Sequence, residues 1–136
     1  MRQFASAVIS GLFGSARRLA AAAEGLLSPT QQQLLRRRAP GRSAPEPWTP
    51  SDLPLVDEAQ WLCGGVPASY GHVVIDEAQD LSPMALRMLA RRADGGSMTV
   101  LGALAPATAP DAAGSWSDAI AALAGAVDEA GPSQRR

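Results

Sequence analysis

The sequence contains no lysine, so all twelve of its basic residues are arginines. It also holds a single cysteine, Cys63, and a single histidine, His72. One cysteine excludes an internal disulfide and a zinc site built from several thiolates. The lone histidine directly precedes an apolar run, and we expect neither a metal nor a catalytic role for it. The lack of lysine also excludes a P-loop of the Gly-x-x-x-x-Gly-Lys-Ser/Thr type, in which the lysine holds phosphate.

No apolar stretch is long enough to cross a membrane, so no membrane-spanning helix is expected. The start of the chain combines an arginine, a short apolar patch and an alanine-rich tract, which faintly resembles a signal or transit peptide. Arg17 and Arg18 interrupt this segment, however, and Phe4, Val8 and Leu12 lie one helical turn apart. We therefore interpret the segment as a helix and expect the protein to be cytoplasmic.

The charge of the chain is unevenly distributed although its formal net charge is only −1. Residues 1–42 carry seven arginines and one acid, whereas the remainder carries five arginines and twelve acids. Such a division can indicate an electrostatic footprint for nucleic acid. A solvated helical face is the commoner explanation of the same pattern.

The pattern along the 136 residues divides the chain into four segments. Residues 1–38 are expected to be helical, and a capping box at Ser28-Pro29-Thr30-Gln31 marks the start of the third short helix. Residues 39–50 hold four prolines and no periodicity, which indicates a loop. Residues 51–127 combine strand and helix patterns, and residues 128–136 are expected to form a disordered tail.

Two buried-type strands are predicted at 72–75 and 98–101, with a helix that begins near Ser82 between them. This strand–helix–strand unit predicts a parallel α/β sheet. Ser115 is expected to cap a final helix, together with Asp118. A pair of parallel strands normally has further neighbours and helices on its faces. We therefore expect an exposed edge and an apolar face, and an isolated chain that is marginally stable or prone to associate.

Two acidic pairs in the sequence could each end such a strand. The first, Asp57-Glu58, follows Pro54, which a central strand cannot accommodate, so we assign it to a helix that ends at 64–65 and give it no chemistry. The second, Asp76-Glu77, directly follows the apolar run and leads into Gln79 and Asp80. This is the pattern of a Walker B element, whose first acid anchors Mg²⁺ and whose second orients or activates water. The alternative is a strand that ends in a polar turn.

The run Asp-Glu-Ala-Gln-Asp at 76–80 resembles motif II of the UvrD/Rep-like superfamily 1 helicases. Residues 48–59, 70–84 and 98–102 are similar to the HelD-type branch, whose members are ATPases associated with bacterial RNA polymerase. The similarity covers about residues 15–125 and is strong over 70–102. It implies an α/β fold, namely part of a RecA-like P-loop NTPase domain.

The resemblance also implies ligands and roles for individual residues. ATP and Mg²⁺ are the cofactors of the parent family, and DNA or RNA polymerase, or both, are the implied partners. Glu77 takes the catalytic position, while Asp76 and Gln79 lie at the nucleotide. Asp76 would bind Mg²⁺ only if a P-loop is supplied.

Two departures limit what the resemblance implies. Motif III of this family reads Gly-Asp-x-x-Gln, but the matching positions here are Gly102, Ala103 and Pro106, so both polar side chains are missing. Thr108 remains where the family has a threonine. The P-loop and the later arginine-bearing motifs are also absent, so the chain looks like an internal slice of a helicase.

Three functions remain open at this point. In the first interpretation, the chain is a degenerate or truncated helicase product that is inactive alone and binds no nucleotide tightly. Alternatively, it is one piece of a split helicase whose missing half supplies the P-loop. In the third interpretation it is a non-catalytic module that binds RNA polymerase or nucleic acid.

Overall fold

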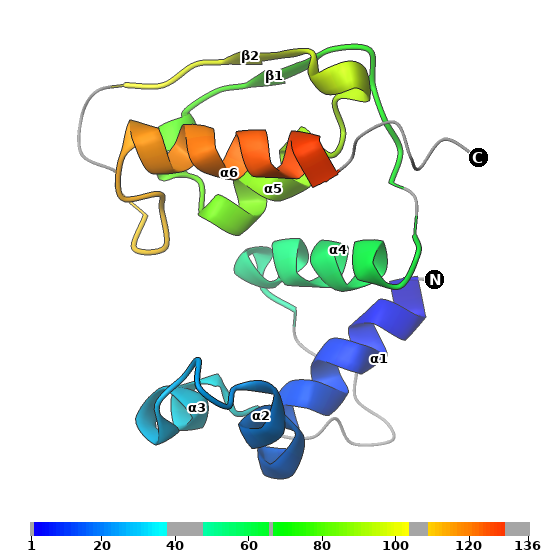
Figure 1. Ribbon diagram of the computed structural model, residues 1–136, viewed down its shortest axis with the longest axis vertical. Helices are drawn as coiled ribbons and strands as arrows, with labels where there is room; N and C mark the ends of the chain where they lie inside the picture. Colours follow the sequence, from blue (N-terminus) through cyan, green and yellow to red (C-terminus); the bar gives the residue numbers. More distant parts are fainter. Residues whose placement is uncertain (1, 38–47, 66, 104–108, 130–136) are drawn as a thin grey trace. The chain divides into compact units, whose positions relative to one another are not determined.

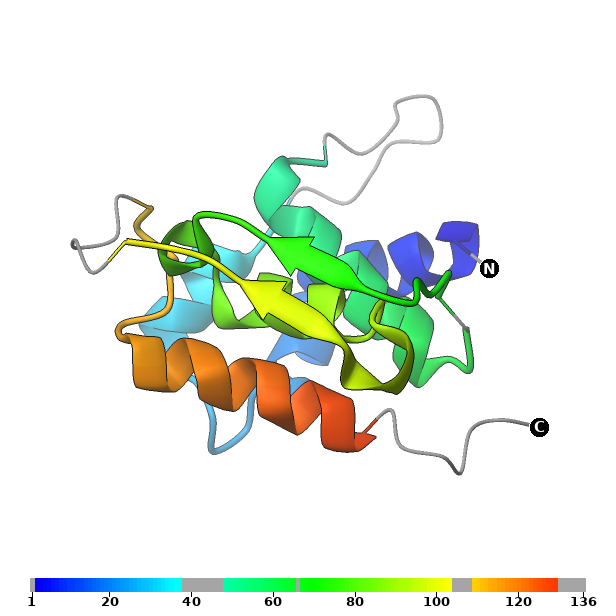
Figure 2. The ribbon, with the colours of Figure 1, turned by 90° about the horizontal axis from the view of Figure 1, so that it is seen from above.

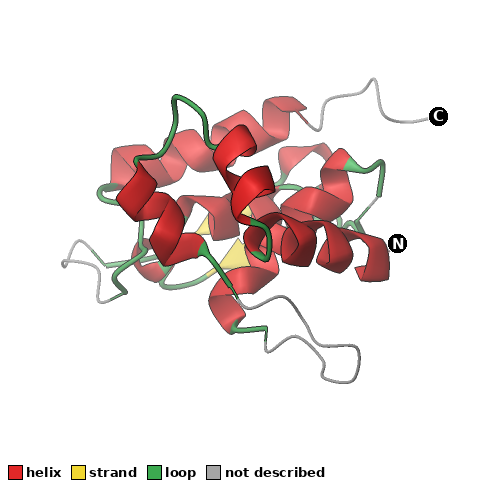
Figure 3. Ribbon diagram, turned by 90° about the horizontal axis from the view of Figure 1, so that it is seen from below, coloured by secondary structure: helices red, strands yellow, loops and turns green. Residues whose placement is uncertain are grey.

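The computed structural model of the chain describes residues 2–37, 48–65, 67–103 and 109–129. The contacts between residues divide the chain into two compact units, Met1–Gly65 and Val66–Arg136 (Figure 1). Helices provide most of the regular structure of the described residues, and the strands are short (Figure 3). None of the described helices is both long and apolar enough to cross a membrane.

Helices form the whole of the regular structure described in the first unit (Figure 1). Helix α1 (Arg2–Phe13) packs against α2 (Ala16–Ala22) and against α4 (Leu53–Leu62), and α3 (Pro29–Leu35) packs against α2. Ser28 begins α3 with the expected capping box, because its hydroxyl accepts from the Gln31 N–H at 3.3 Å and the Gln31 side chain accepts from the Ser28 N–H at 2.9 Å.

The buried face of α1 lies one residue away from the stripe of Phe4, Val8 and Leu12. Phe4 and Val8 are 63% and 42% exposed. The buried side chains of this unit's core are apolar and come from α1, α2 and α4: Ala5, Ile9, Phe13, Leu19 and Ala59. Both stripes satisfy the helical period, so spacing alone could not decide between them. The smaller Ala5 allows the closer approach of a neighbouring helix.

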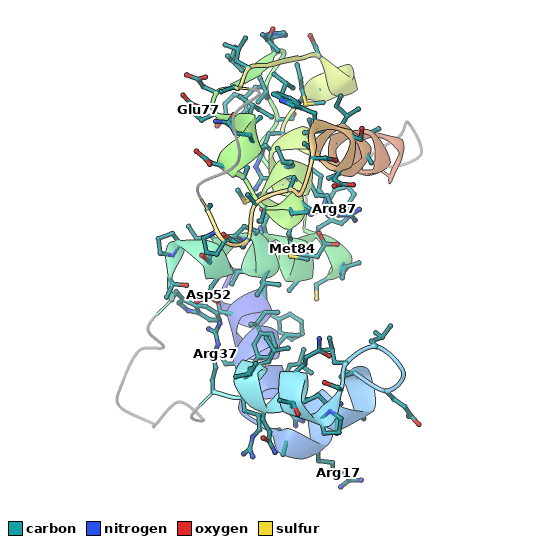
Figure 4. The ribbon with its side chains drawn as sticks, turned by 90° about the vertical axis from the view of Figure 1, so that its left-hand side faces the viewer. Arg17, Arg37, Asp52, Glu77, Met84 and Arg87 are labelled. Atoms are coloured by element: carbon teal, nitrogen blue, oxygen red, sulfur yellow. The ribbon has the colours of Figure 1, made fainter. Side chains whose placement is uncertain are left out.

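A bidentate ion pair joins the end of α3 to the start of α4 (Figure 4). Arg37 donates to both carboxylate oxygens of Asp52, with Nη1 3.1 Å from Oδ2. The guanidinium carbon lies 5.3 Å and 5.8 Å from the ring centroids of Phe13 and Trp48. Asp52 also accepts from the N–H and hydroxyl of Thr49, at 2.9 and 2.8 Å. These donors, with Arg37 the largest influence, lower the pKa of Asp52 to about 2.

Helix α4 contains the first acidic pair, Asp57-Glu58, so this pair ends no strand. Pro54 is buried in the first turn of the helix, a position that proline tolerates. Because α4 packs on α1 through Ala59, residues 51–65 belong with the N-terminal helices. The sequence pattern instead predicts these residues at the start of the α/β part. Most of the expected proline-rich loop at 39–50 lies outside the described residues.

The second unit contains a small parallel α/β arrangement, as predicted. Strands β1 (Val73–Ile75) and β2 (Met98–Val100) pair in parallel, and α5 (Pro83–Ala90) lies between them in the chain. Their register places Val73 opposite Met98. The last helix, α6 (Trp116–Glu129), packs against α5. Residues 128–129, expected in a tail, are thus helical, and 130–136 lie outside the described residues.

The two helices lie on one face of the sheet (Figure 2). Ile75 of β1 forms one core with buried side chains that include Leu86, Ala90 and Leu123, and the partly buried Met98 and Val100 of β2 pack against this core. On the opposite face, Val74 is 63% exposed. The sheet of the described residues therefore has an open face with an exposed apolar side chain, as its two-strand pattern predicted.

Candidate functional site

The carboxyl ends of β1 and β2 meet at one edge, because the strands are parallel. Pairing continues past both strands. The Leu101 N–H donates to the Ile75 carbonyl at 2.8 Å, and the Ala78 N–H donates to the Leu101 carbonyl at 3.0 Å. The segment from Asp76 to Gln79 therefore lies against the residues that follow β2. This edge is where open α/β sheets bind their ligands.

Glu77 turns the chain sharply as it leaves β1. Its φ of 50° and ψ of 41° are left-handed, and among the described non-glycine residues it alone has a positive φ. Such a conformation costs roughly 1–2 kcal/mol for an ordinary residue. A hydrogen bond and the burial of the next residue favour the turn. The Glu77 N–H donates to the Asp76 carboxylate at 2.9 Å, and the following Ala78 is fully buried. Both carboxylates are left exposed at the edge.

Gln79 connects the two strand ends through its side-chain amide. Its Nε2 donates to the Glu77 carboxylate at 2.5 Å, and its Oε1 accepts from the Ala103 N–H at 3.0 Å. These partners determine how the amide is oriented, because a backbone N–H must face oxygen and a carboxylate must face nitrogen. We call this pair of hydrogen bonds the Gln79 bridge. It holds the second carboxylate of β1 at a set position relative to the end of β2.

Gly102 and Trp116 complete the surroundings of the Gln79 bridge. A β-carbon at Gly102 would collide with Gln79 Oε1 and would lie 2.8 Å from the indole ring of Trp116. The indole N–H donates to the Ala103 carbonyl at 3.4 Å. A side chain at position 102 would therefore displace the Gln79 amide or the Trp116 ring. Trp116 was not among the predicted site residues, because nothing in the spacing of α6 distinguishes it from a core residue.

The structure brings together most of the residues that the motif assignments predicted: Asp76, Glu77, Gln79, Gly102 and Ala103. Ala103 takes part only through its backbone groups. Pro106 and Thr108, the other predicted motif III positions, lie outside the described residues.

The lone histidine and cysteine lie apart from this network of hydrogen bonds. His72 places Nδ1 2.8 Å from the Ser97 hydroxyl and Nε2 3.0 Å from the Thr99 hydroxyl. Cys63 is an exposed free thiol that directly follows α4. In the part of the chain that the structure describes, no three histidine, cysteine or acidic side chains are grouped so that they could hold a metal ion.

The chemistry available at the edge is that of two exposed carboxylates, one of them held by an amide. Within the described residues neither Asp76 nor Glu77 forms an ion pair with an arginine. Such groups can bind a hard cation or accept a proton from water. Comparisons of the chain with protein-family models, with curated proteins and with solved structures found no match. The geometry of the site is therefore the basis on which a function can be proposed.

Proposed function

We propose that the second unit is the motif II-to-III part of a RecA-like ATPase domain, of the kind found in UvrD/Rep-like, HelD-type helicases. The Gln79 bridge is the observation that supports this proposal most strongly. It links the acid pair after one parallel strand to the first residues after the next strand, where motifs II and III would lie. A strand that merely ends in a polar turn requires no such link.

The donors at the edge fit Mg²⁺, which typically takes one or two carboxylates and completes its shell with water and phosphate oxygens. Asp76 would hold the ion, since one of its oxygens accepts from the Glu77 N–H and the side chain is exposed. When bound, Mg²⁺ neutralises charge on the phosphates. Glu77 would accept a hydrogen bond from the attacking water, and Gln79 would keep that carboxylate in position.

The same chain lacks the groups that hold a nucleotide. It contains no lysine to contact phosphate, and the methyl group of Ala103 cannot donate a hydrogen bond. Asp76 and Glu77 would instead repel a triphosphate. We therefore propose that the chain alone neither binds ATP tightly nor hydrolyses it, and that a P-loop would have to come from another polypeptide segment. Binding to DNA or to RNA polymerase is part of the proposal only through the family.

The proposal can be tested by grafting residues 70–108 into the matching segment of an intact HelD-like helicase. The graft should fold and bind ATP, because both strands and the α5 core positions are kept. Its hydrolysis rate should fall about 10²–10³-fold, the usual cost of losing one transition-state hydrogen-bond donor. The matched control is a graft of residues 70–101, which keeps the parent's own motif III and should stay active. Hydrolysis by the longer graft at the parent's rate, or loss of ATP binding in the control, would contradict the proposal.

A further inference from the structure

The two units of the chain carry charge of opposite sign. The first holds seven arginines and five acids, and the second holds five arginines and eight acids. Net charges of this kind matter for association when the responsible groups are exposed and unpaired. One exposed group of each sign, in each case accompanied by exposed apolar side chains, meets this condition.

The exposed basic group lies where α1 meets α2. Arg17 and Arg18 are exposed in the first turn of α2, and Arg17 projects away from the helices (Figure 4). The Arg37 N–H donates to the Phe13 carbonyl at 3.0 Å, which brings the exposed Arg36 to the same junction. Among the described residues, none of these three arginines forms an ion pair. We call Arg17, Arg18 and Arg36 the basic corner.

An exposed leucine lies near each end of α3. Leu34, two residues before Arg36, is 81% exposed, and Leu26, which precedes the helix, is 78% exposed. Helix α3 buries none of its residues in the chain. Exposed leucines beside charges of one sign can be covered by a partner that carries the opposite charge.

The exposed acidic group lies on the open face of the sheet. Val74 and Asp76 point to the same face, because side chains alternate along a strand. Leu101, 48% exposed, lies beside Asp76, since its backbone pairs with Ile75 and Ala78. Glu77 follows at the edge and is also exposed. We call Val74, Asp76, Glu77 and Leu101 the acidic sheet end.

We propose that the basic corner of one copy docks on the acidic sheet end of a second copy. The charges are complementary, both surfaces carry exposed aliphatic side chains, and the open face of a parallel sheet is normally covered. Each docked pair leaves one surface of each kind unused. The contact is therefore heterologous, and a further copy can dock on each unused surface.

Sedimentation velocity of the full chain at increasing concentration tests the proposal. In about 0.05 M salt the weight-average mass should rise steadily above the monomer's 14.0 kDa. In about 0.5 M salt the apparent affinity should fall at least about tenfold, because screening at that concentration shortens the reach of exposed charges to a few ångströms. A monomer at every concentration, or association that salt does not change, would overturn the proposal. The second result would indicate pairing of sheet edges instead.

Charge reversal identifies the two surfaces. Arg17→Glu/Arg18→Glu/Arg36→Glu and Asp76→Arg/Glu77→Arg should each be monomeric, and an equimolar mixture of the two variants should associate again. Asp111→Arg reverses an exposed acid elsewhere in the second unit and should associate like the unmodified chain. Asp76→Asn/Glu77→Gln keeps the side-chain shapes and should be monomeric even if the arginine variant fails to fold. A mixture that stays monomeric, although each variant has the circular dichroism of the unmodified chain, would contradict the pairing.

Discussion

Replacing Gln79 by leucine removes both hydrogen bonds of the Gln79 bridge while it keeps much of the side-chain volume. In one of these bonds the Gln79 amide donates to the Glu77 carboxylate, and in the other the Ala103 N–H donates to the neutral Gln79 amide oxygen. Bonds of these two kinds are worth about 1.5–3 and 0.5–1.5 kcal/mol. Because Gln79 is only half-buried and Glu77 is exposed, water recovers part of this. We expect Gln79→Leu to destabilise the second unit by about 2 kcal/mol.

Amide hydrogen exchange followed by NMR reports this change at one atom. The Ala103 N–H donates to Gln79 Oε1 in the unmodified chain. Its protection factor should fall at least about tenfold in Gln79→Leu, which corresponds to about 1.4 kcal/mol. The Val73 N–H, which donates to the Ser97 carbonyl at 3.1 Å, serves as an internal control for general opening of the sheet.

Two further variants separate the bonds of the bridge. Gln79→Glu keeps an acceptor for the Ala103 N–H but places a second carboxylate against Glu77, so it should lower stability while Ala103 stays better protected than in Gln79→Leu. Combining Gln79→Glu with Glu77→Gln exchanges donor and acceptor and should restore most of the loss. Unchanged Ala103 exchange in Gln79→Leu, or a double variant no more stable than Gln79→Glu, would refute this reasoning.

Three other outcomes follow from the contacts. Gly102→Ala should lower the free energy of unfolding by about 1–3 kcal/mol, because the new methyl group collides with Gln79 and Trp116. The control Gly71→Ala, whose methyl meets nothing within 4 Å, should change the midpoint of urea unfolding little. Asp52→Asn should cost about 2 kcal/mol at pH 7, since the pKa of Asp52 is lowered from 3.8 to about 2 in the folded chain. This stabilisation is complete above pH 3.8 and disappears as the pH falls through about 2. In acid denaturation, the free energies of unfolding of the unmodified chain and of Asp52→Asn should therefore converge near that pH. Parallel curves of stability against pH would contradict the role assigned to the Arg37–Asp52 ion pair. Calorimetry should detect no Mg-ATP binding in the micromolar range, and a micromolar dissociation constant would contradict the lack of a phosphate cradle.

Features that depend on neighbouring residues could be predicted from the sequence. Ser82 and Ser115 cap α5 and α6, where their hydroxyls accept from the N–H groups of Ala85 and Asp118, both at 3.2 Å. The apolar runs on either side of α5 predicted parallel strands, which β1 and β2 form. Each of these signals lies within one turn or one strand, so no distant contact is needed to interpret it.

Features that depend on contacts between distant segments could not be predicted. Arg37 and Asp52 are 15 positions apart, and Gln79 and Ala103 are 24 apart. Trp116 contacts the site because α6 returns beside the strands, which periodicity cannot show. For Asp52 a local signal did exist, since Thr-x-x-Asp at 49–52 is typical of a helix start.

The central claim is that the segments after β1 and β2 are motifs II and III. The grafted helicase tests it most directly once its motif III is restored. Ala103→Asp with Pro106→Gln in the graft of residues 70–108 should bring ATP hydrolysis back to within about tenfold of the parent, because the missing polar groups are worth about 10²–10³-fold. Adding Glu77→Gln to the restored graft should abolish hydrolysis while ATP binding is retained. Hydrolysis that is unchanged by Glu77→Gln would contradict the assignment of this acid, and of the motif that contains it.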